Sequence, residues 1–253
     1  MDNKEITMLD ILTETHIGLQ RQGPGSVEMT VKALSFMENI SEISRVADLG
    51  CGTGGQTMVL AQNIAGTVVG IDQFPDFINV LNDNAQKLNL GERVTGVVDS
   101  MENLSFQQEE FDLIWSEGAI DAIGFETGLT HWNTFLKKNG YIAVTCPSWL
   151  TDEHPAEIQK FWTDAGSGLD SVADNIRVMQ KCGYSFVASF TLPEKCWIDN
   201  YFIPRESEEK ALLEKYPESD TVKEYIESSK YEAELYSKYK QYYGYVFYIG
   251  KKA

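Results

Sequence analysis

Apolar residues follow two alternating patterns along the chain. Short apolar runs such as 67–71 are typical of buried strands, whereas Phe77, Leu81 and Ala85 recur at helical spacing within 75–89. The expected strands are 46–49, 67–71, 94–98, 111–116, 141–147, 184–192 and 245–251, and the expected helices include 58–65, 75–89, 126–138 and 171–181. Strands that alternate with helices predict an α/β fold with a doubly wound, mostly parallel sheet and helices on both faces.

One long segment, 193–243, interrupts this alternation just before the last strand. A simple hairpin there needs only a few residues, so we interpret the segment as a helical insertion, with Pro217 between two helices. Its first part is aromatic and contains Trp197 and Tyr201. Two interpretations stay open: the insertion is a lid whose aromatic side chains face a ligand pocket, or these side chains only pack it against the sheet. The inward stripe expected of its second part is Val222, Ile226, Ala233 and Tyr236.

The strongest chemical signal is the run VADLGCGTGGQT at 46–57. An apolar strand leads into a turn with almost no side-chain bulk, where a ligand can lie against bare backbone, and a helix follows. Asp72 ends the next strand, about twenty residues after the glycines, where a carboxylate accepts hydrogen bonds from both ribose hydroxyls. The pattern predicts a pocket for a nucleoside cofactor.

Two kinds of cofactor satisfy this pattern. Gly50, Gly52 and Gly55 match G-x-G-x-x-G, which is typical of dinucleotide-binding oxidoreductases. Asp48, however, places a carboxylate two residues before the first glycine, where NAD would bring its anionic pyrophosphate. S-adenosylmethionine has no phosphate and carries an ammonium and a sulfonium, so Asp48 favours it on electrostatic grounds.

Over about residues 20–192 the chain resembles the class I S-adenosylmethionine-dependent methyltransferases, particularly the small-molecule "type 11" group that includes enzymes of ubiquinone and sterol biosynthesis. The resemblance implies a seven-stranded sheet in the order 3-2-1-4-5-7-6 with an antiparallel last strand. It also implies the cofactor contacts. The first motif is Asp48, Gly50, Gly52 and Gly54, whose glycines contact the methionine part; Asp72 with Gln73 binds the ribose; Asp99, Ser100 and Met101 hold the adenine; and Glu117, Gly118 and Ala119 lie near the transferred methyl.

The segment before the first strand is expected to form a helical cap over residues 1–43. Its loop QRQGPGS, 20–26, is expected by resemblance to close over the cofactor. Arg21 in this loop suits the cofactor's carboxylate, because a guanidinium fork matches that geometry. The alternative is an exposed loop arginine. We expect the whole chain, 1–253, to form a single methyltransferase domain.

Composition narrows the partners. The chain has 21 basic and 38 acidic residues and a net charge of −17, which repels a phosphate backbone and disfavours nucleic acid. The sequence after the fourth strand is SEGAI, without the N/D-P-P-Y/F run of DNA amino-methylating enzymes in this superfamily. A small-molecule acceptor is therefore favoured, although an acidic protein is also suited to a basic protein segment.

Other signals concern location and metals. The amino terminus MDNKEITMLDILTE lacks the uninterrupted apolar core of a signal peptide, and no apolar run has membrane-spanning length, so we expect a cytoplasmic protein without a membrane partner. Four scattered cysteines and three histidines show no zinc-ligand spacing, so no metal is expected. A homodimer is compatible with the sequence.

The expected chemistry is an in-line displacement in which the enzyme aligns acceptor, methyl and sulfur. A hydroxyl or protonated amine acceptor also needs a base, and the candidates are His154, Glu117 and Asp121. Each has a plainer alternative: a surface loop residue, a residue that only orients the cofactor, and a helix cap, respectively. Two other functions stay open, an NAD-dependent oxidoreductase and a non-catalytic protein that binds S-adenosylmethionine and regulates a partner.

Overall fold

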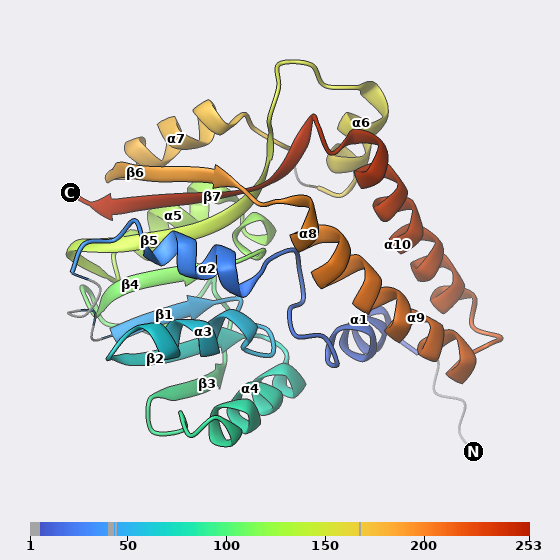
Figure 1. The fold of residues 1–253 in the computed structure, drawn as a ribbon, viewed down its shortest axis with the longest axis horizontal. Coiled ribbons are helices and arrows are strands. Elements are labelled where there is room, and N and C mark those ends of the chain that lie inside the picture. The colour runs from blue at the N-terminus through green and yellow to red at the C-terminus, as the bar shows by residue number, and fades with distance from the viewer. Residues whose placement is uncertain (1–5, 40–42, 44, 167) are drawn as a thin grey trace.

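A seven-stranded sheet forms the centre of the computed structural model, which describes residues 6–39, 43, 45–166 and 168–253. Its strand order is β3-β2-β1-β4-β5-β7-β6, and β7 runs antiparallel to both of its neighbours (Figure 1). The strands are β1 Arg45–Leu49, β2 Thr67–Asp72, β3 Val94–Val98, β4 Phe111–Ser116, β5 Leu136–Trp149, β6 Tyr184–Thr191 and β7 Tyr243–Lys252. The predicted fold class and strand order are confirmed.

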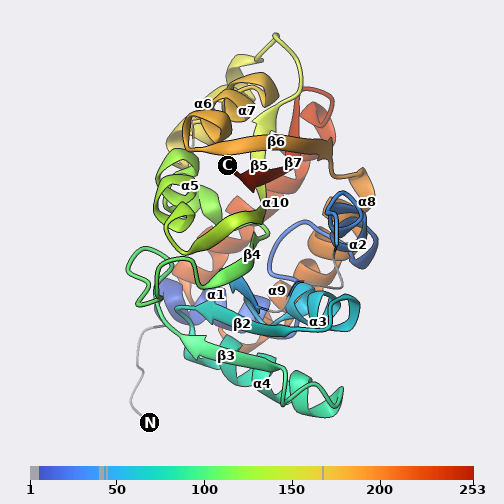
Figure 2. The same ribbon diagram turned by 90° about the vertical axis from the view of Figure 1, so that its left-hand side faces the viewer.

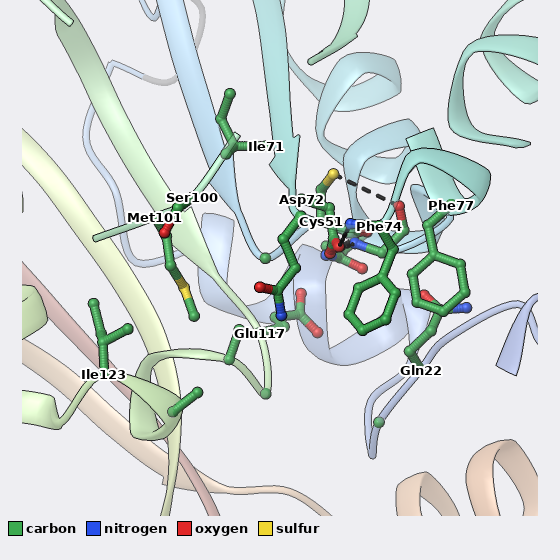
Figure 3. A pocket seen from close by; sticks show the side chains of 18 of the residues that line it. Gln22, Cys51, Ile71, Asp72, Phe74, Phe77, Ser100, Met101, Glu117 and Ile123 are labelled. Atoms are coloured by element: carbon green, nitrogen blue, oxygen red, sulfur yellow. Dashed lines mark hydrogen bonds between the residues drawn. The ribbon is translucent and has the colours of Figure 1, made fainter. Parts of the chain in front are cut away.

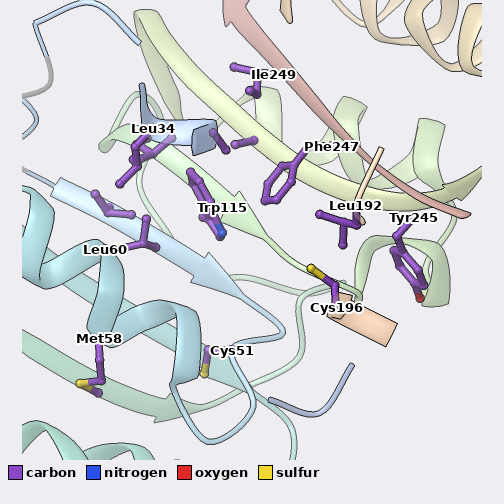
Figure 4. Close-up of a cluster of buried hydrophobic side chains, with 14 of the residues drawn as sticks. Leu34, Cys51, Met58, Leu60, Trp115, Leu192, Cys196, Tyr245, Phe247 and Ile249 are labelled. Carbon is purple, nitrogen blue, oxygen red and sulfur yellow. The ribbon is translucent and has the colours of Figure 1, made fainter. Parts of the chain in front are cut away.

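Helices cover both faces of the sheet (Figure 2). One face is covered by α2 Val27–Leu34, α3 Gly55–Asn63 and α4 Pro75–Lys87, and the other by α5 Phe125–Asn133 and α7 Val172–Lys181; α6 is Ala156–Asp164. Alternate residues of one strand serve the two faces, because side chains along a strand point to opposite sides. In β4, Trp115 packs against Phe247 in the core on the face covered by α2, α3 and α4, as Figure 4 shows. Ile114 belongs to the core on the face covered by α5 and α7.

The helix predicted over 126–138 is too long. Helix α5 ends at Asn133, and β5 begins at Leu136, which is fully buried and pairs with Phe111 at the start of β4. The register between the two strands shifts after this pair, and Asn139 takes a left-handed conformation with φ 64°. A helix continued to Lys138 would remove Leu136 from its buried place in the sheet. The sequence-based interpretation also missed α6.

The insertion over 193–243 consists of α8 Glu194–Trp197, a π-helical turn at Ile198–Phe202, α9 Ile203–Lys215 and α10 Asp220–Tyr239. Helices α9 and α10 lie beyond the carboxyl ends of the parallel strands, next to α1 Met8–His16 (Figure 1). Val222 and Ile226 of the predicted stripe pack with Ile11 of α1, and Tyr236 stacks on Trp197. Ala233 is only half-buried. The predicted cap over 1–43 contains α1 and α2, and its residues 1–5 and 40–42 lie outside the described residues.

A buried polar cluster connects the helices of the insertion to one another. Arg205 of α9 donates to the hydroxyl of Tyr201 at 2.7 Å and to Glu232 of α10 at 2.9 Å, and it also pairs with Glu209. Burial lowers the pKa of His16, next to Tyr201, to about 4, so this imidazole is neutral at physiological pH. A paired buried cation resists rearrangement, because separation would leave an uncompensated charge.

Replacement of Trp197 tests the packing role of the insertion. The indole is 1% exposed, and its ring lies 4.3 Å from that of Tyr236. We expect Trp197→Ala to lower the free energy of unfolding by about 3–5 kcal/mol, because it leaves a large cavity. Urea denaturation measures the change. The control is Tyr231→Ala in α10, because Tyr231 is 44% exposed. Equal losses in the two variants would contradict the assignment of Trp197 to the core.

Candidate functional site

A cavity of about 380 Å³ opens at the carboxyl ends of β1 to β4 (Figure 3). The topology explains its place, because the carboxyl ends of parallel strands meet at one edge of the sheet, where the chain turns into helices. Most of the predicted cofactor residues line it: Arg21, Gly50, Gly52, Asp72, Gln73, Asp99, Ser100, Met101, Glu117, Gly118 and Ala119.

The glycine turn forms a wall of bare backbone. Gly50 and Gly52 have φ of 72° and 54°, a conformation that L side chains rarely adopt. A Cβ on Gly50 would lie 2.3 Å from that of Ala119, and one on Gly52 would lie 2.0 Å from Oε1 of Gln22. Any side chain at these positions would therefore displace the neighbouring wall of the cavity.

Asp72 is fixed at the end of β2 beside this turn. Its carboxylate accepts hydrogen bonds from the backbone N–H of Gly52 at 2.9 Å and of Phe74 at 3.0 Å. Burial raises its pKa, although these backbone donors oppose the shift. Phe74 and Phe77 stack on each other at 5.0 Å, and both line the cavity. The carboxylate thus lies between bare backbone and an aromatic wall.

The end of β3 supplies a polar edge. The backbone N–H of Asp99 bonds to the carbonyl of Asp72 at 3.1 Å, which places the two acids side by side on neighbouring strands. Asp99 itself accepts from the N–H of Ser100 at 2.8 Å. Met101 and Ile123 extend as apolar side chains toward the cavity from the next wall (Figure 3).

A buried ion pair closes the cavity from the side of the cap. Nη1 of Arg21 donates to Oε2 of Glu117 at 2.6 Å, and the two side chains are only 7% and 3% exposed. Thr30 donates to Oε1 of the same carboxylate at 2.7 Å, as does the indole of Trp115 at 2.9 Å. Arg21 is therefore a buried cavity residue, and the alternative of an exposed loop arginine is wrong. Its anionic partner in this structure is Glu117.

Gln22 ties the cap to the glycine turn, a role that the sequence-based interpretation missed. Its amide accepts from the backbone N–H of Thr53 and donates to the Thr53 hydroxyl, both at 2.9 Å. On the other side, Asn200 of the insertion donates to the carbonyl of Gly25 at 2.7 Å. The sequence-based interpretation also missed Phe74 and Phe77 as cavity residues. Their positions two and five residues after Asp72 could have indicated this role.

Asp48 lies behind the glycine turn, and it is not among the residues that line the cavity. It is fully buried and accepts hydrogen bonds from Thr57 at 2.6 Å and Gln56 at 3.4 Å. Burial, with help from the nearby Glu117 charge, raises its pKa to about 7. In this structure Asp48 supports the turn from within and does not line the cavity, and its contact with the cofactor stays a prediction.

Gly54 is also absent from the cavity lining. With φ 89° it is the N-cap of α3, and a Cβ there would lie 2.8 Å from the side chain of Leu81. Its place is explained by the close packing of α3 on α4 rather than by ligand contact. The assignment of Gly54 to the cofactor stays a prediction.

Trp197 and Tyr201, predicted to face the methyl group, do not line the cavity. Trp197 is stacked on Tyr236 in the core, and the hydroxyl of Tyr201 accepts a hydrogen bond from Arg205. Burial therefore explains both aromatic residues, and the packing alternative describes their positions in this structure.

The three candidate bases differ in their surroundings. His154 is exposed, stacked on Trp149 at 4.2 Å, and outside the cavity lining. Glu117 lines the cavity, but three donors already occupy its carboxylate. Asp121 lies on the short 3-10 helix Ile120–Ala122 next to the cavity, and its Oδ1 is buried without a hydrogen-bond partner among the described residues.

Two structural features are absent from the described residues. No group of three or more His, Cys, Asp or Glu side chains in this part of the chain is arranged to hold a metal ion. None of the helices formed by these residues is both long and apolar enough to cross a membrane.

Replacement of Gly50 tests the bare-backbone wall. We expect Gly50→Ala to weaken the binding of S-adenosylhomocysteine at least about tenfold, because the added methyl collides with Ala119 and the backbone conformation is strained. Isothermal titration calorimetry measures the affinity. Gly23→Ala is the matched control, since Gly23 also lines the cavity but a Cβ there meets no atom within 4 Å. Equal affinities in the two variants would refute a close approach of ligand to Gly50.

Asp48 gives the fold a pH dependence. Because its folded-state pKa is raised to about 7, its contribution to stability is complete below the unfolded pKa of about 4 and is lost as the pH rises through about 7. Between about pH 4 and pH 7 the free energy of unfolding of wild type should therefore fall by up to roughly 1.4 kcal/mol per pH unit because of Asp48. We expect Asp48→Asn to lack this fall. Denaturation of wild type, Asp48→Asn and the exposed-site control Asp152→Asn at several pH values measures it. An unchanged slope in Asp48→Asn would disprove the assignment.

The curated relatives match part of their length. A phosphoethanolamine N-methyltransferase of Plasmodium falciparum is 30% identical over 174 residues, which are 67% of this chain and 64% of that protein. A probable cobalt-precorrin-6B C(15)-methyltransferase of Methanobrevibacter smithii is 35% identical over 91 residues, 36% of this chain and 48% of the relative. The matched segments thus span about half to two thirds of these relatives.

Solved structures share the fold over nearly the whole chain. A methyltransferase of Geobacter sulfurreducens, solved with S-adenosylhomocysteine, gives a TM-score of 0.84 at 19% identity and covers 98% of this chain and 99% of its own. A second, from Thiobacillus denitrificans, gives 0.82 at 19% identity, with 98% and 100% covered. The sequence profile described as "Methyltransferase domain" matches residues 40–216. The chain therefore belongs to the methyltransferase domain family, with the fold of the class I S-adenosylmethionine-dependent enzymes.

Proposed function

We propose that this chain transfers a methyl group from S-adenosylmethionine to a small-molecule acceptor by direct in-line displacement, without a metal ion. The observation that carries the proposal is the arrangement of Asp72 beside the bare backbone of Gly50 and Gly52 in one cavity. A nucleoside needs a carboxylate for its ribose and an open wall for its close approach, and both are present there. Family membership and the likeness of fold support the same cofactor.

The remaining lining fits the other parts of the cofactor. Asp99 and Ser100 suit an adenine edge, because a carboxylate accepts from an exocyclic amine, and Met101 offers an apolar wall. At the opposite end, Arg21 and Glu117 carry one charge of each sign, as does the zwitterionic amino-acid end of S-adenosylmethionine. The cavity residues from Asp99 to Arg21 in the cap therefore suit the cofactor from its adenine to its amino-acid end.

The protein's own contribution to the reaction is placement and exclusion of water. When bound, S-adenosylmethionine supplies an electrophilic methyl group on its sulfonium. Gly118 and Ala119 form the wall expected near that methyl, and the N–H of Gly118 is held by Thr145 at 2.7 Å. The cap loop with Arg21 and Gln22 forms one side of the cavity. Alignment of two reactants is worth roughly 7 to 11 kcal/mol in well-oriented systems.

Several features support a small acceptor. The net charge of −17 disfavours nucleic acid, and the named activities of the relatives concern small molecules such as phosphoethanolamine and cobalt-precorrin-6B. A cytoplasmic location, a homodimer and a single domain over 1–253 stay predictions.

Ligand-dependent stability tests the cofactor assignment. S-adenosylhomocysteine at about a hundred times its dissociation constant should add roughly 2.7 kcal/mol to the unfolding free energy, whereas NADH should add nothing. Thermal denaturation with each ligand measures this. Asp72→Asn should reduce the S-adenosylhomocysteine shift, because it removes the charged acceptor for ribose hydroxyls. A shift with NADH alone would overturn the proposal, and tight cofactor binding with no turnover of a broad acceptor panel would favour a non-catalytic regulator.

A further inference from the structure

A hydrogen bond joins the insertion to the cap loop, 20–26. Nδ2 of Asn200, in the π-helical turn of the insertion, donates to the carbonyl oxygen of Gly25 at 2.7 Å. Gly25 is buried and Asn200 is half-buried, so this bond is partly protected from water. A buried backbone carbonyl needs a donor, because an unpaired polar group away from water is costly. Asn200 supplies that donor from a segment distant in the sequence.

Asn200 is held in place by buried residues on both sides of it in the chain. Trp197, three residues before it, is 1% exposed and stacks on Tyr236 of α10. Tyr201, the next residue, is also buried, and its hydroxyl accepts a hydrogen bond from Arg205. Both aromatic side chains pack in the interior, whereas the side chain of Asn200 reaches the cap loop. The aromatic residues of the insertion therefore fix the backbone from which Asn200 makes its contact.

Gly25 also lies directly against the ion pair of Arg21 and Glu117. A Cβ on Gly25 would lie 2.9 Å from Nη1 of Arg21 and 3.1 Å from Oε2 of Glu117, the two atoms that form the pair. Because Gly25 has no side chain, its backbone packs against both charged groups, and a shift of that backbone would displace them. The contact from Asn200 thus reaches, through one glycine, two residues that line the cavity.

On the basis of the proposed function, we propose that Asn200 is a positioning residue for the amino-acid end of S-adenosylmethionine. Arg21 and Glu117 carry the charges that suit the carboxylate and the ammonium of that end. Such hydrogen bonds depend on distance and direction, so displaced charges bind the ligand less tightly. The ribose and the adenine are assigned to Asp72 and Asp99, which are fixed by backbone donors of their own. Asn200 therefore favours ligands that carry the amino-acid end.

A purely structural role of Asn200 predicts a different result. A lost contact that only destabilised the fold would weaken every ligand of the cavity by the same factor, because each binds the folded state. The proposed role weakens only ligands with the amino-acid end. Two ligands distinguish these cases. S-adenosylhomocysteine has that end, whereas 5′-methylthioadenosine has the same adenosine and a thioether sulfur but a methyl group in its place.

Calorimetric titration of both ligands into wild type and variants tests the inference. Asn200→Leu keeps the branched shape of the side chain but removes the amide donor. We expect wild type to bind S-adenosylhomocysteine at least about tenfold more tightly than 5′-methylthioadenosine, and Asn200→Leu to reduce this ratio at least about fivefold. The affinity for 5′-methylthioadenosine should change less than about twofold. The matched control is Asp199→Leu, since Asp199 is exposed in the same turn, and its ratio should equal that of wild type.

The outcomes separate this inference from the proposed function. Equal affinity of wild type for the two ligands, or a ratio that stays unchanged in Asn200→Leu, overturns the role of Asn200 and leaves the cofactor assignment standing. Failure of wild type to bind S-adenosylhomocysteine overturns both. If Asn200→Leu does not fold, Asn200→Ala decides, because it also lacks the donor and adds no bulk. A wild-type ratio in Asn200→Ala would then overturn the inference.

Discussion

The buried ion pair between Arg21 and Glu117 is the constraint on which the site depends. It joins the cap loop to the end of β4, and the two side chains are only 7% and 3% exposed. Removal of one partner from such a pair costs about 3–5 kcal/mol, because the other charge is left uncompensated. Thr30 and Trp115 complete the shell around the carboxylate, so the pair is fixed in direction as well as in place. The pair therefore fixes the cap loop relative to the end of β4.

The same cap loop connects the sheet to the insertion. Gln22 holds it to the glycine turn, and Asn200 holds its far end at Gly25. Asn200 itself lies in a π-helical turn, an uncommon geometry that is frequent at functional sites. The insertion is thus connected to the cavity through the cap loop, although its aromatic residues Trp197 and Tyr201 pack in the protein interior. Its contribution to the site is support of the loop that lines the cavity.

The parts of the structure that depend on local pattern were predictable. The apolar strands, the glycine turn and the acid at Asp72 follow from residue order alone, because parallel strands must end at one edge of the sheet. Contacts between segments far apart in sequence were not. Gln22 reaches Thr53, and Asp48 lies outside the cavity lining, because of packing that no local pattern encodes. The end of α5 was misplaced for a similar reason: Leu136 is taken by a strand partner, which outweighs its helical spacing.

The charge of the cavity affects S-adenosylmethionine and its product S-adenosylhomocysteine differently. Asp72, Asp99 and Glu117 all line it, and Arg21 neutralises only one of them. The surplus of negative charge is compatible with a sulfonium, and it opposes a pyrophosphate even though Asp48 lies outside the lining. After transfer, the sulfur is a neutral thioether, so the product loses the electrostatic attraction that held the donor. The field that admits the charged cofactor therefore also favours release of the spent one.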